Sequence, residues 1–164
     1  MVKTPEQCGI LVVEDDPAIR RLVKMVLSRE GYKVEVAQDG VEAVLKLGLS
    51  EYDAIILDLM MPNLDGFSFM NTLATSDPSR LKRIIVTSAA SPNVIRERMT
   101  AQPYAVLPKP FDIQLLVKQV DALVASHNCA CAHTAPTGSG KGSAISGSCF
   151  PGNRRDGRRA CRRR

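Results

Sequence analysis

The sequence lacks the long apolar segments that membrane proteins need. Its apolar runs have the length of a strand, and none approaches the roughly 18 consecutive apolar residues of a membrane-spanning helix. We also find no signal peptide, because the first apolar run, residues 9–13, is too short and acidic residues follow it at once. We therefore expect a cytoplasmic protein that has no membrane partner.

Cysteine is too scarce in most of the chain for a disulfide framework. Five cysteines is an odd number, and only Cys8 lies within residues 1–126. A large positive charge is also missing from this part. Residues 127–164 hold eight of the 22 basic side chains and one of the 17 acidic ones, which leaves 14 basic and 16 acidic side chains in residues 1–126. The net charge of +5 therefore belongs to the C-terminal segment.

Strand-length apolar runs alternate with amphipathic segments of helix length. The predicted strands are residues 10–13, 33–37, 54–57, 83–86 and 105–107. Helix starts are indicated by Asp16-Pro17, Asp39, Ser91-Pro92 and Asp112, each a capping residue before an apolar period. The helix after Asp39 is expected to carry its apolar residues at Val41, Val44, Leu45 and Leu47. Five such alternations predict an α/β fold with a doubly wound, five-stranded parallel sheet.

The composition changes after Ser126. Residues 127–164 are rich in Gly, Ser, Ala and Cys and then in Arg, without a sustained apolar period. Such a segment buries too little apolar surface to offset the entropy of ordering it. We therefore expect one domain at residues 8–126 and a low-complexity, basic and disordered tail at 127–164.

Polar residues follow the predicted strands. Glu14 and Asp15 come after the first strand, Asp58 after the third, Thr87 after the fourth and Lys109 after the fifth. The carboxyl ends of parallel strands share one edge of the sheet, where ligands of such folds bind. We therefore expect these five side chains to meet.

Three carboxylates close together repel one another, so the cluster requires a cation. Mg²⁺ is suited to it, since this ion binds through one or two carboxylates, waters and a phosphate. The hydroxyl of Thr87 and the ammonium of Lys109 are able to hold phosphoryl oxygens. Asp58 would then accept a phosphoryl group as an acyl phosphate. By contrast, Asp16 before proline indicates an N-cap, and Asp65 before glycine indicates a turn.

Four motifs resemble the receiver domain of response regulators in bacterial two-component signalling. They are LVVEDDP at 11–17, ILDLMMPNLDG at 56–66, VTSAA at 86–90 and LPKPF at 107–111. Together they span nearly all of residues 8–126, and the chain is similar to the single-domain chemotaxis regulators of this family. The resemblance implies a flavodoxin-like (βα)5 fold.

The resemblance also implies roles for single residues. Asp58 aligns with the phosphoacceptor, Thr87 with the switch hydroxyl and Lys109 with the phosphate-binding lysine. The Mg²⁺ ligands would be Glu14, Asp15, Asp58 and the backbone carbonyl of Met60, and the bond before Pro110 would be cis. A sensor histidine kinase or histidine phosphotransfer protein would donate the phosphoryl group, and a downstream protein would receive the signal. Such a module has no separate substrate, so we expect no enzyme.

One departure from the family concerns output. Three residues before the lysine, where the family carries an aromatic residue, this sequence has Val106, and Tyr104 lies two residues earlier. We hypothesise that the signal instead travels through a shift of the loops after the fourth and fifth strands.

The tail offers further motifs. Residues 135–141 imitate a P-loop, but the first glycine is absent and Gly142 replaces the required Ser or Thr. His127, Cys129, Cys131 and His133 alternate with spacers shorter than those of zinc sites, so any metal binding there is expected to be adventitious. The Arg-rich end predicts weak, salt-sensitive and unspecific binding of nucleic acid or another anionic partner. Two alternatives stay open: a receiver that gates this basic tail, and a receiver-like scaffold that never carries phosphate.

Overall fold

The structure is a computed structural model that describes residues 4–62, 65–99 and 101–130. By its internal contacts the chain divides into two units, Met1–Thr134 and Ala135–Arg164, and all described residues belong to the first. Residues 131–164 of the tail that was predicted to be disordered lie outside the described part, and so do its P-loop imitation and the residues Cys131 and His133. None of the described helices is both long enough and apolar enough to cross a membrane.

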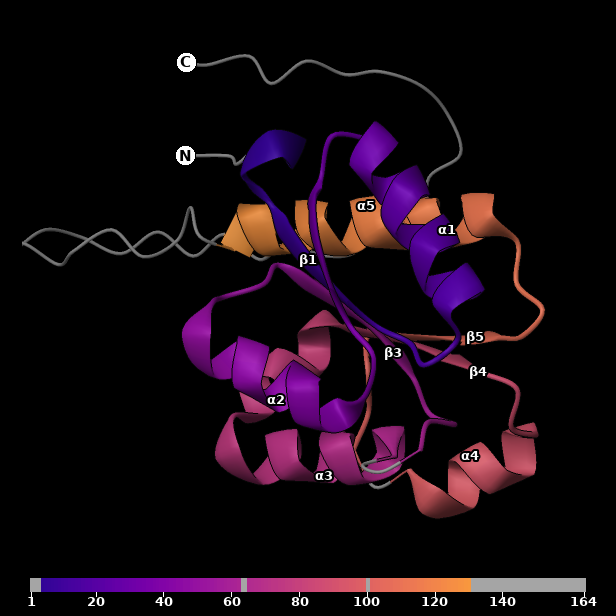
Figure 1. Ribbon diagram of the computed structural model, residues 1–164. Coiled ribbons are helices and arrows are strands. Elements are labelled where there is room, and N and C mark those ends of the chain that lie inside the picture. Colours follow the sequence, from indigo (N-terminus) through magenta and orange to yellow (C-terminus); the bar gives the residue numbers. More distant parts are fainter. Residues whose placement is uncertain (1–3, 63–64, 100, 131–164) are drawn as a thin grey trace, which may run out of the picture. The chain divides into compact units, whose positions relative to one another are not determined.

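Strands and helices alternate along the described chain, as the sequence predicted (Figure 1). The strands are β1 (Gly9–Val13), β2 (Lys33–Ala37), β3 (Ala54–Asp58), β4 (Ile84–Ser88) and β5 (Ala105–Pro108). The α-helices are α1 (Pro17–Arg29), α2 (Gly40–Leu49), α3 (Gly66–Ser76), α4 (Pro92–Arg98) and α5 (Ile113–Ala130). Two short 3-10 helices, η1 (Pro5–Gln7) and η2 (Pro78–Arg83), precede β1 and β4.

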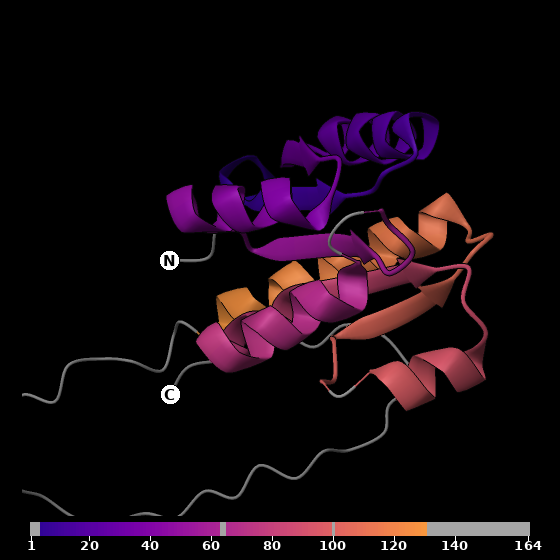
Figure 2. The same ribbon diagram turned by 60° about the horizontal axis from the view of Figure 1, so that its bottom comes forward.

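The five strands form one parallel sheet in the order β2-β1-β3-β4-β5. This is the predicted doubly wound, flavodoxin-like arrangement, in which the chain order reverses beside β1. Helices α1 and α5 cover one face, and α2, α3 and α4 cover the other (Figures 1 and 2).

Alternate residues of each strand pack on opposite faces of the sheet, because successive side chains of a strand point to opposite sides. In β1, Leu11 and Val13 pack toward α2 and α3, whereas Ile10 and Val12 pack toward α1 and α5. Since both faces are covered, β1, β3 and β4 are almost entirely buried. This explains why these strands have continuous apolar sequences instead of alternating ones.

The predicted helix caps are present. Asp16 accepts hydrogen bonds from the backbone N–H groups of Ala18 and Ile19, and Asp39 accepts one from Glu42. Ser91 and Asp112 cap α4 and α5 in the same way. Gly31 ends α1 with a φ of +94°, in the left-handed region that favours glycine.

Four strands extend further than the sequence predicted: β1 begins one residue earlier, at Gly9, and β3, β4 and β5 end later, at Asp58, Ser88 and Pro108. Asp58 is the last residue of β3, and Thr87 and Ser88 are the last two of β4, because Asp58 pairs with Thr87 and Ser88 pairs with Pro108. The prediction that Arg83 belongs to the fourth strand is wrong. Arg83 lies in η2 and donates to the carbonyl of Tyr52 at 3.1 Å. Helix α5 continues to Ala130, four residues past the change in composition.

The apolar residues of α2 were only partly identified as core. Leu47 is buried as expected and shares the buried side of the helix with Ala43 and Gly40. Val41, Val44 and Leu45, in contrast, are 53%, 39% and 65% exposed. A run of apolar residues all round the helix concealed which side faces the sheet.

Candidate functional site

The carboxyl ends of β1 and β3 bring three acidic side chains together. Ligand oxygens of Glu14, Asp15 and Asp58 all lie within 4.8 Å of one another. Glu14 and Asp58 are buried, each with only 3% of its surface exposed, while Asp15 is exposed to solvent. The acidic cluster that the sequence predicted is therefore present at the predicted edge of the sheet.

Both oxygens of Asp58 have hydrogen-bond donors. Oδ1 accepts from the backbone N–H of Met60 at 3.0 Å, and Oδ2 accepts from the ammonium of Lys109 at 2.6 Å. A carboxylate oxygen carries two lone pairs, so each oxygen keeps one for another partner. The Asp58 carboxylate is thus fixed by two hydrogen bonds, and each of its oxygens keeps a free lone pair for a further partner. The expectation that the carbonyl of Met60 binds a cation stays a prediction.

Lys109 connects β5 to the acidic cluster. Its Nζ donates to Oε1 and Oε2 of Glu14 at 2.8 and 2.9 Å and to Oδ2 of Asp58. Its backbone N–H donates to the carbonyl of Ser88 at 2.7 Å, which joins the loop after β5 to the end of β4. The bond between Lys109 and Pro110 is cis, as the resemblance implied.

Burial and charge act in opposite directions on these groups. Burial raises the pKa of Glu14 above its usual range, although the hydrogen bond from Lys109 works against this. Burial also tends to lower the pKa of Lys109, but the hydrogen bonds to Asp58 and Glu14 outweigh it, so that this pKa is raised. The ammonium is therefore charged at neutral pH and partly neutralises the carboxylates beside it.

The two remaining predicted features lie on β4 and β5. Thr87 is buried in register with Asp58, so their side chains leave the sheet on the same side, and its hydroxyl faces the carbonyl of Leu57 at 3.5 Å. Val106 is 39% exposed and so is Tyr104, whose backbone N–H donates to Ile84. Tyr104 therefore precedes β5 and does not take the register position of Val106.

The donor set fits Mg²⁺. All three side chains offer carboxylate oxygens, the ligands that this hard cation prefers, and two of them are at adjacent positions in one loop. The three carboxylate oxygens lie within 4.8 Å of one another, so one cation between them would be within reach of all three side chains.

Two acidic residues near the site have other roles. Asp16 caps α1, as predicted from its position before proline, whereas Asp65, which was predicted to belong to a turn, caps α3. Asp65 also forms an ion pair at 2.8 Å with Arg98, whose guanidinium lies 4.3 Å from the ring centre of Phe67. These contacts connect the start of α3 with the end of α4.

The sequence analysis missed two residues that shape the site. Arg20 donates to the carbonyls of Glu14 and Asp15 at 2.7 and 3.1 Å. A cation near the N-terminus of a helix is disfavoured by the helix dipole, and this was a signal in the sequence. At Gly66, a Cβ atom would lie 2.4 Å from the carbonyl oxygen of Asp58. No local pattern reveals that contact.

Comparison with known proteins agrees with this site. A family model described as response regulator receiver domain matches residues 10–121. The curated response regulator MprA of Mycobacterium sp. (strain KMS) is 40% identical over 116 residues, which is 70% of this chain and 50% of that protein. The chain therefore spans about half the length of the curated relatives that it matches.

Solved structures give the same result. The receiver domain of the Francisella response regulator 1452 matches with a TM-score of 0.66 and 31% identity over 73% of this chain and 98% of that one. The receiver domain of the sensor histidine kinase PA1611 from Pseudomonas aeruginosa, solved with a magnesium ion in its active-site cleft, matches with a TM-score of 0.65 and 30% identity over 72% and 98%. None of these matches supports nucleic-acid binding through the tail or an unphosphorylated scaffold.

Proposed function

The chain belongs to the family of response regulator receiver domains, and on this premise we propose that it accepts a phosphoryl group on Asp58 in a two-component system or phosphorelay. The observation that carries the proposal is the position of the Asp58 carboxylate. It lies at the end of a buried strand, 2.6 Å from the ammonium of Lys109 and beside the carboxylates of Glu14 and Asp15.

In the proposed reaction, an oxygen of Asp58 attacks the phosphorus atom of a phosphohistidine. A bond between this oxygen and phosphorus forms, and the bond between phosphorus and the imidazole nitrogen breaks. The electron pair stays on that nitrogen, so a ring that is protonated at its other nitrogen leaves as neutral imidazole, and an unprotonated ring must take up a proton from solvent as it leaves. The products are an aspartyl phosphate and a free histidine on the donor protein.

Lys109 and Thr87 are proposed to hold the transferred group. The ammonium already contacts the oxygen of Asp58, and it would follow the charge onto the phosphoryl oxygens as these arrive. The hydroxyl of Thr87, on the neighbouring strand, would donate to another phosphoryl oxygen. Positioning and charge neutralisation are the main requirements of phosphoryl transfer, so these two residues suffice as donors from the protein.

Mg²⁺ is the proposed cofactor, held by Glu14, Asp15, Asp58 and the backbone carbonyl of Met60. When bound, the ion supplies positive charge that neutralises the phosphoryl oxygens and the acidic cluster. Asp15 is the exposed member of the cluster and is therefore the one that an ion from solvent meets first.

We further propose that the phosphodonor is a sensor histidine kinase or a histidine phosphotransfer protein and that the module works in the cytoplasm. Output would pass to a downstream protein over the surface formed by α4, β5 and α5. The module phosphorylates only itself, and in this sense we do not regard it as an enzyme with a substrate of its own.

The test is incubation of the full chain with Mg²⁺ and acetyl phosphate, followed by intact-mass measurement. We expect the mass to increase by one phosphoryl group, and hydroxylamine, which cleaves acyl phosphates, to remove it. Asp58→Asn should abolish the increase. Asp112→Asn is a matched control, because it also replaces a carboxylate and keeps a residue that can cap α5. Phosphorylation of Asp58→Asn, or none of the wild type, would overturn the proposal.

A further inference from the structure

The loop between β1 and α1 directs two consecutive carboxylates to the same site. Consecutive residues of a strand point to opposite faces of the sheet. Glu14 and Asp15 are consecutive, yet oxygens of both lie within 4.8 Å of Asp58. The chain must therefore leave the strand conformation directly after Val13. The carbonyl groups of Glu14 and Asp15 then have no hydrogen-bond partner within the sheet.

Backbone carbonyls outside a sheet or helix need other donors, because an unpaired one is costly where water is excluded. For Glu14 and Asp15 the donor is Arg20, whose Nη1 bonds to both carbonyls at 2.7 and 3.1 Å. The backbone N–H of Glu14 donates to Ala37 on β2 at 3.1 Å. The peptide of Glu14 is thus held on both sides, by β2 and by α1.

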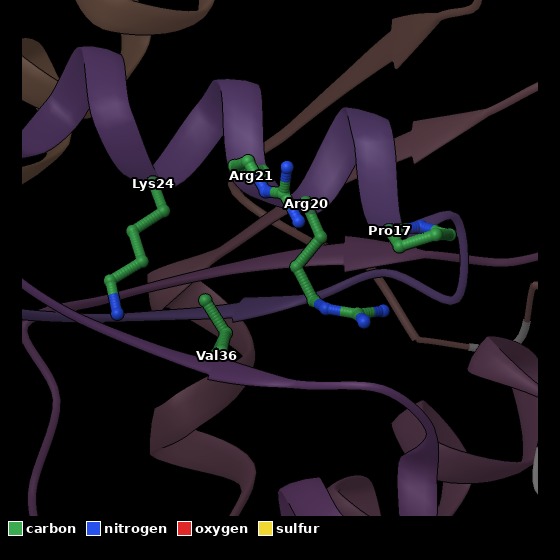
Figure 3. A pocket seen from close by; sticks show the side chains of 5 residues that line it. All are labelled: Pro17, Arg20, Arg21, Lys24 and Val36. Atoms are coloured by element: carbon green, nitrogen blue, oxygen red, sulfur yellow. The ribbon is translucent and has the colours of Figure 1, made fainter.

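The placement of Arg20 within its helix supports a specific role. Arg20 lies one turn into α1, and its backbone N–H donates to the carbonyl of Asp16. The helix therefore fixes the backbone position from which the Arg20 side chain extends. Together with Pro17, Arg21, Lys24 and Val36 it lines a hollow of about 310 Å³. Arg20 and Lys24 leave α1 on the same side, with Val36 of β2 between them (Figure 3).

The two basic residues beside Arg20 show that positive charge alone does not explain its contacts. Arg21 and Lys24 place two further positive charges around the same hollow, yet among the described side chains it is Arg20 that donates hydrogen bonds to the Glu14 and Asp15 carbonyls. A guanidinium also differs from an ammonium, since its N–H groups are fixed in a plane and are not lost by deprotonation.

We propose that Arg20 is a positioning residue for the divalent-cation site: it holds the turn that directs the carboxylates of Glu14 and Asp15 toward Asp58. The inference rests on the proposed function only in taking Mg²⁺ as the cation. Residues that orient metal ligands typically change metal affinity about 10-fold to 100-fold when they are replaced.

The test is isothermal titration of the full-length protein with Mg²⁺, for the wild type, Arg20→Gln, Arg20→Lys and Arg21→Gln. We expect Arg20→Gln to weaken Mg²⁺ binding by about 10-fold or more. Arg21→Gln removes the same charge from the same hollow, and a screened surface charge should alter the affinity by less than about threefold. The difference should persist in 0.5 M salt, on the order of a 4 Å screening length, where an effect of charge alone is lost.

Arg20→Lys distinguishes the two explanations further and serves if Arg20→Gln does not fold, which a thermal unfolding scan reveals. A lysine keeps the charge but lacks the planar pair of donors, so its affinity should fall clearly below that of the wild type. Wild-type affinity in Arg20→Lys, or equal losses in Arg20→Gln and Arg21→Gln, would overturn the proposal.

Phosphorylation kinetics separate this inference from the function on which it rests. With acetyl phosphate, the Mg²⁺ concentration for half-maximal rate should rise in Arg20→Gln while the rate at saturating Mg²⁺ changes little. If the wild type is phosphorylated on Asp58 and Arg20→Gln has an unchanged Mg²⁺ requirement, only the role of Arg20 fails. If the wild type is not phosphorylated at all, the proposed function fails.

Discussion

At the scale of single residues, Asp58 shows how a buried carboxylate is accommodated. An unpaired charge at the end of an apolar strand would be costly. Met60 and Lys109 donate hydrogen bonds to its two oxygens, and Lys109 extends the pairing to Glu14. The same ammonium therefore stabilises the cluster and lies where a phosphoryl group would arrive.

Gly66 makes a clear prediction at this scale. A Cβ atom at Gly66 would lie 2.4 Å from the carbonyl oxygen of Asp58 and 2.7 Å from the Cα atom of Leu59. Both are backbone atoms, so relief requires movement of the residue that carries the phosphoacceptor. Gly66→Ala should therefore lower the free energy of unfolding by about 1–3 kcal/mol, as overpacking does, and should slow phosphorylation by acetyl phosphate.

Urea unfolding and mass measurement check both effects, and Gly48→Ala is the matched control. Nothing lies within 4 Å of a Cβ atom at Gly48 in α2. Alanine is a better helix former by about 1 kcal/mol, so Gly48→Ala should stabilise the protein. Wild-type stability and phosphorylation in Gly66→Ala would show that the loop has more room than the structure indicates.

These residues mark what could be predicted from the sequence. The positions of Glu14, Asp15, Asp58, Thr87 and Lys109 at strand ends follow from topology, because parallel strands end at a common edge. Arg20 and Gly66 shape the site through backbone atoms: Arg20 donates to the carbonyls of Glu14 and Asp15, and Gly66 lies against the backbone of Asp58. Their roles depend on how the loops fold, which spacing does not reveal.

At the scale of secondary-structure elements, polar caps were predicted better than helix faces. Asp16, Asp39, Ser91 and Asp112 cap the expected helices, since capping requires only neighbours in sequence. The buried side of α2 depends on the sheet beneath it. Leu45 at 65% exposure and Leu47 at 6% are both leucines, and composition does not separate them.

Helix α4 has its two ends fixed differently. Its N-terminus follows the loop after Ser88, whereas at its C-terminal end Arg98 pairs with Asp65 and lies over Phe67. A movement that begins at the phosphoryl group would therefore reach the N-terminal end of α4, while its C-terminal end stays in contact with α3. The hypothesis that loops, and not an aromatic at the position of Val106, carry the signal stays a prediction.

We predict that Mg²⁺ with beryllofluoride, an acyl-phosphate mimic, shifts backbone amide resonances in residues 88–99 and 101–110. In Arg98→Gln the shifts at the C-terminal end of α4 should become larger, because an ion pair and a cation–π contact, each on the order of 0.5–1 kcal/mol at a surface, are lost. Arg96→Gln removes a charge from the same turn as a control. Unchanged resonances throughout residues 88–110 of the wild type would contradict the hypothesis.

At the scale of the whole domain, three carboxylates at helix starts predict that the stability of the fold depends on acidic pH. Hydrogen bonds from the backbone N–H groups of Ile19 and Ala18 lower the pKa of Asp16, and the one from Ser68 lowers that of Asp65. For Asp77, which caps η2, the hydroxyl of Ser79 is the main cause of a lowered pKa. All three lie below the ordinary value of 3.8.

The sign of the effect follows from proton binding. A carboxyl with a lowered pKa in the folded state binds fewer protons there than in the unfolded chain near its pKa. Its contribution to stability is therefore present above pH 3.8 and is lost as the pH falls through the folded-state pKa. All three pKa values are lowered from the same ordinary value, so their losses fall in the same acidic range, and the free energy of unfolding should decline as the pH falls below about 4.

Replacing Asp16, Asp65 and Asp77 together by asparagine should flatten this decline. Asparagine caps a helix nearly as well as aspartate but does not titrate, so the variant should lose less stability between pH 5 and pH 3 than the wild type. Urea unfolding at several pH values measures the slope. A control with Glu30, Glu35 and Glu97 replaced by glutamine removes as many exposed carboxyls without touching a helix start. Equal slopes in the two variants would mean that general surface charge, and not the capping hydrogen bonds, sets the acid sensitivity of this domain.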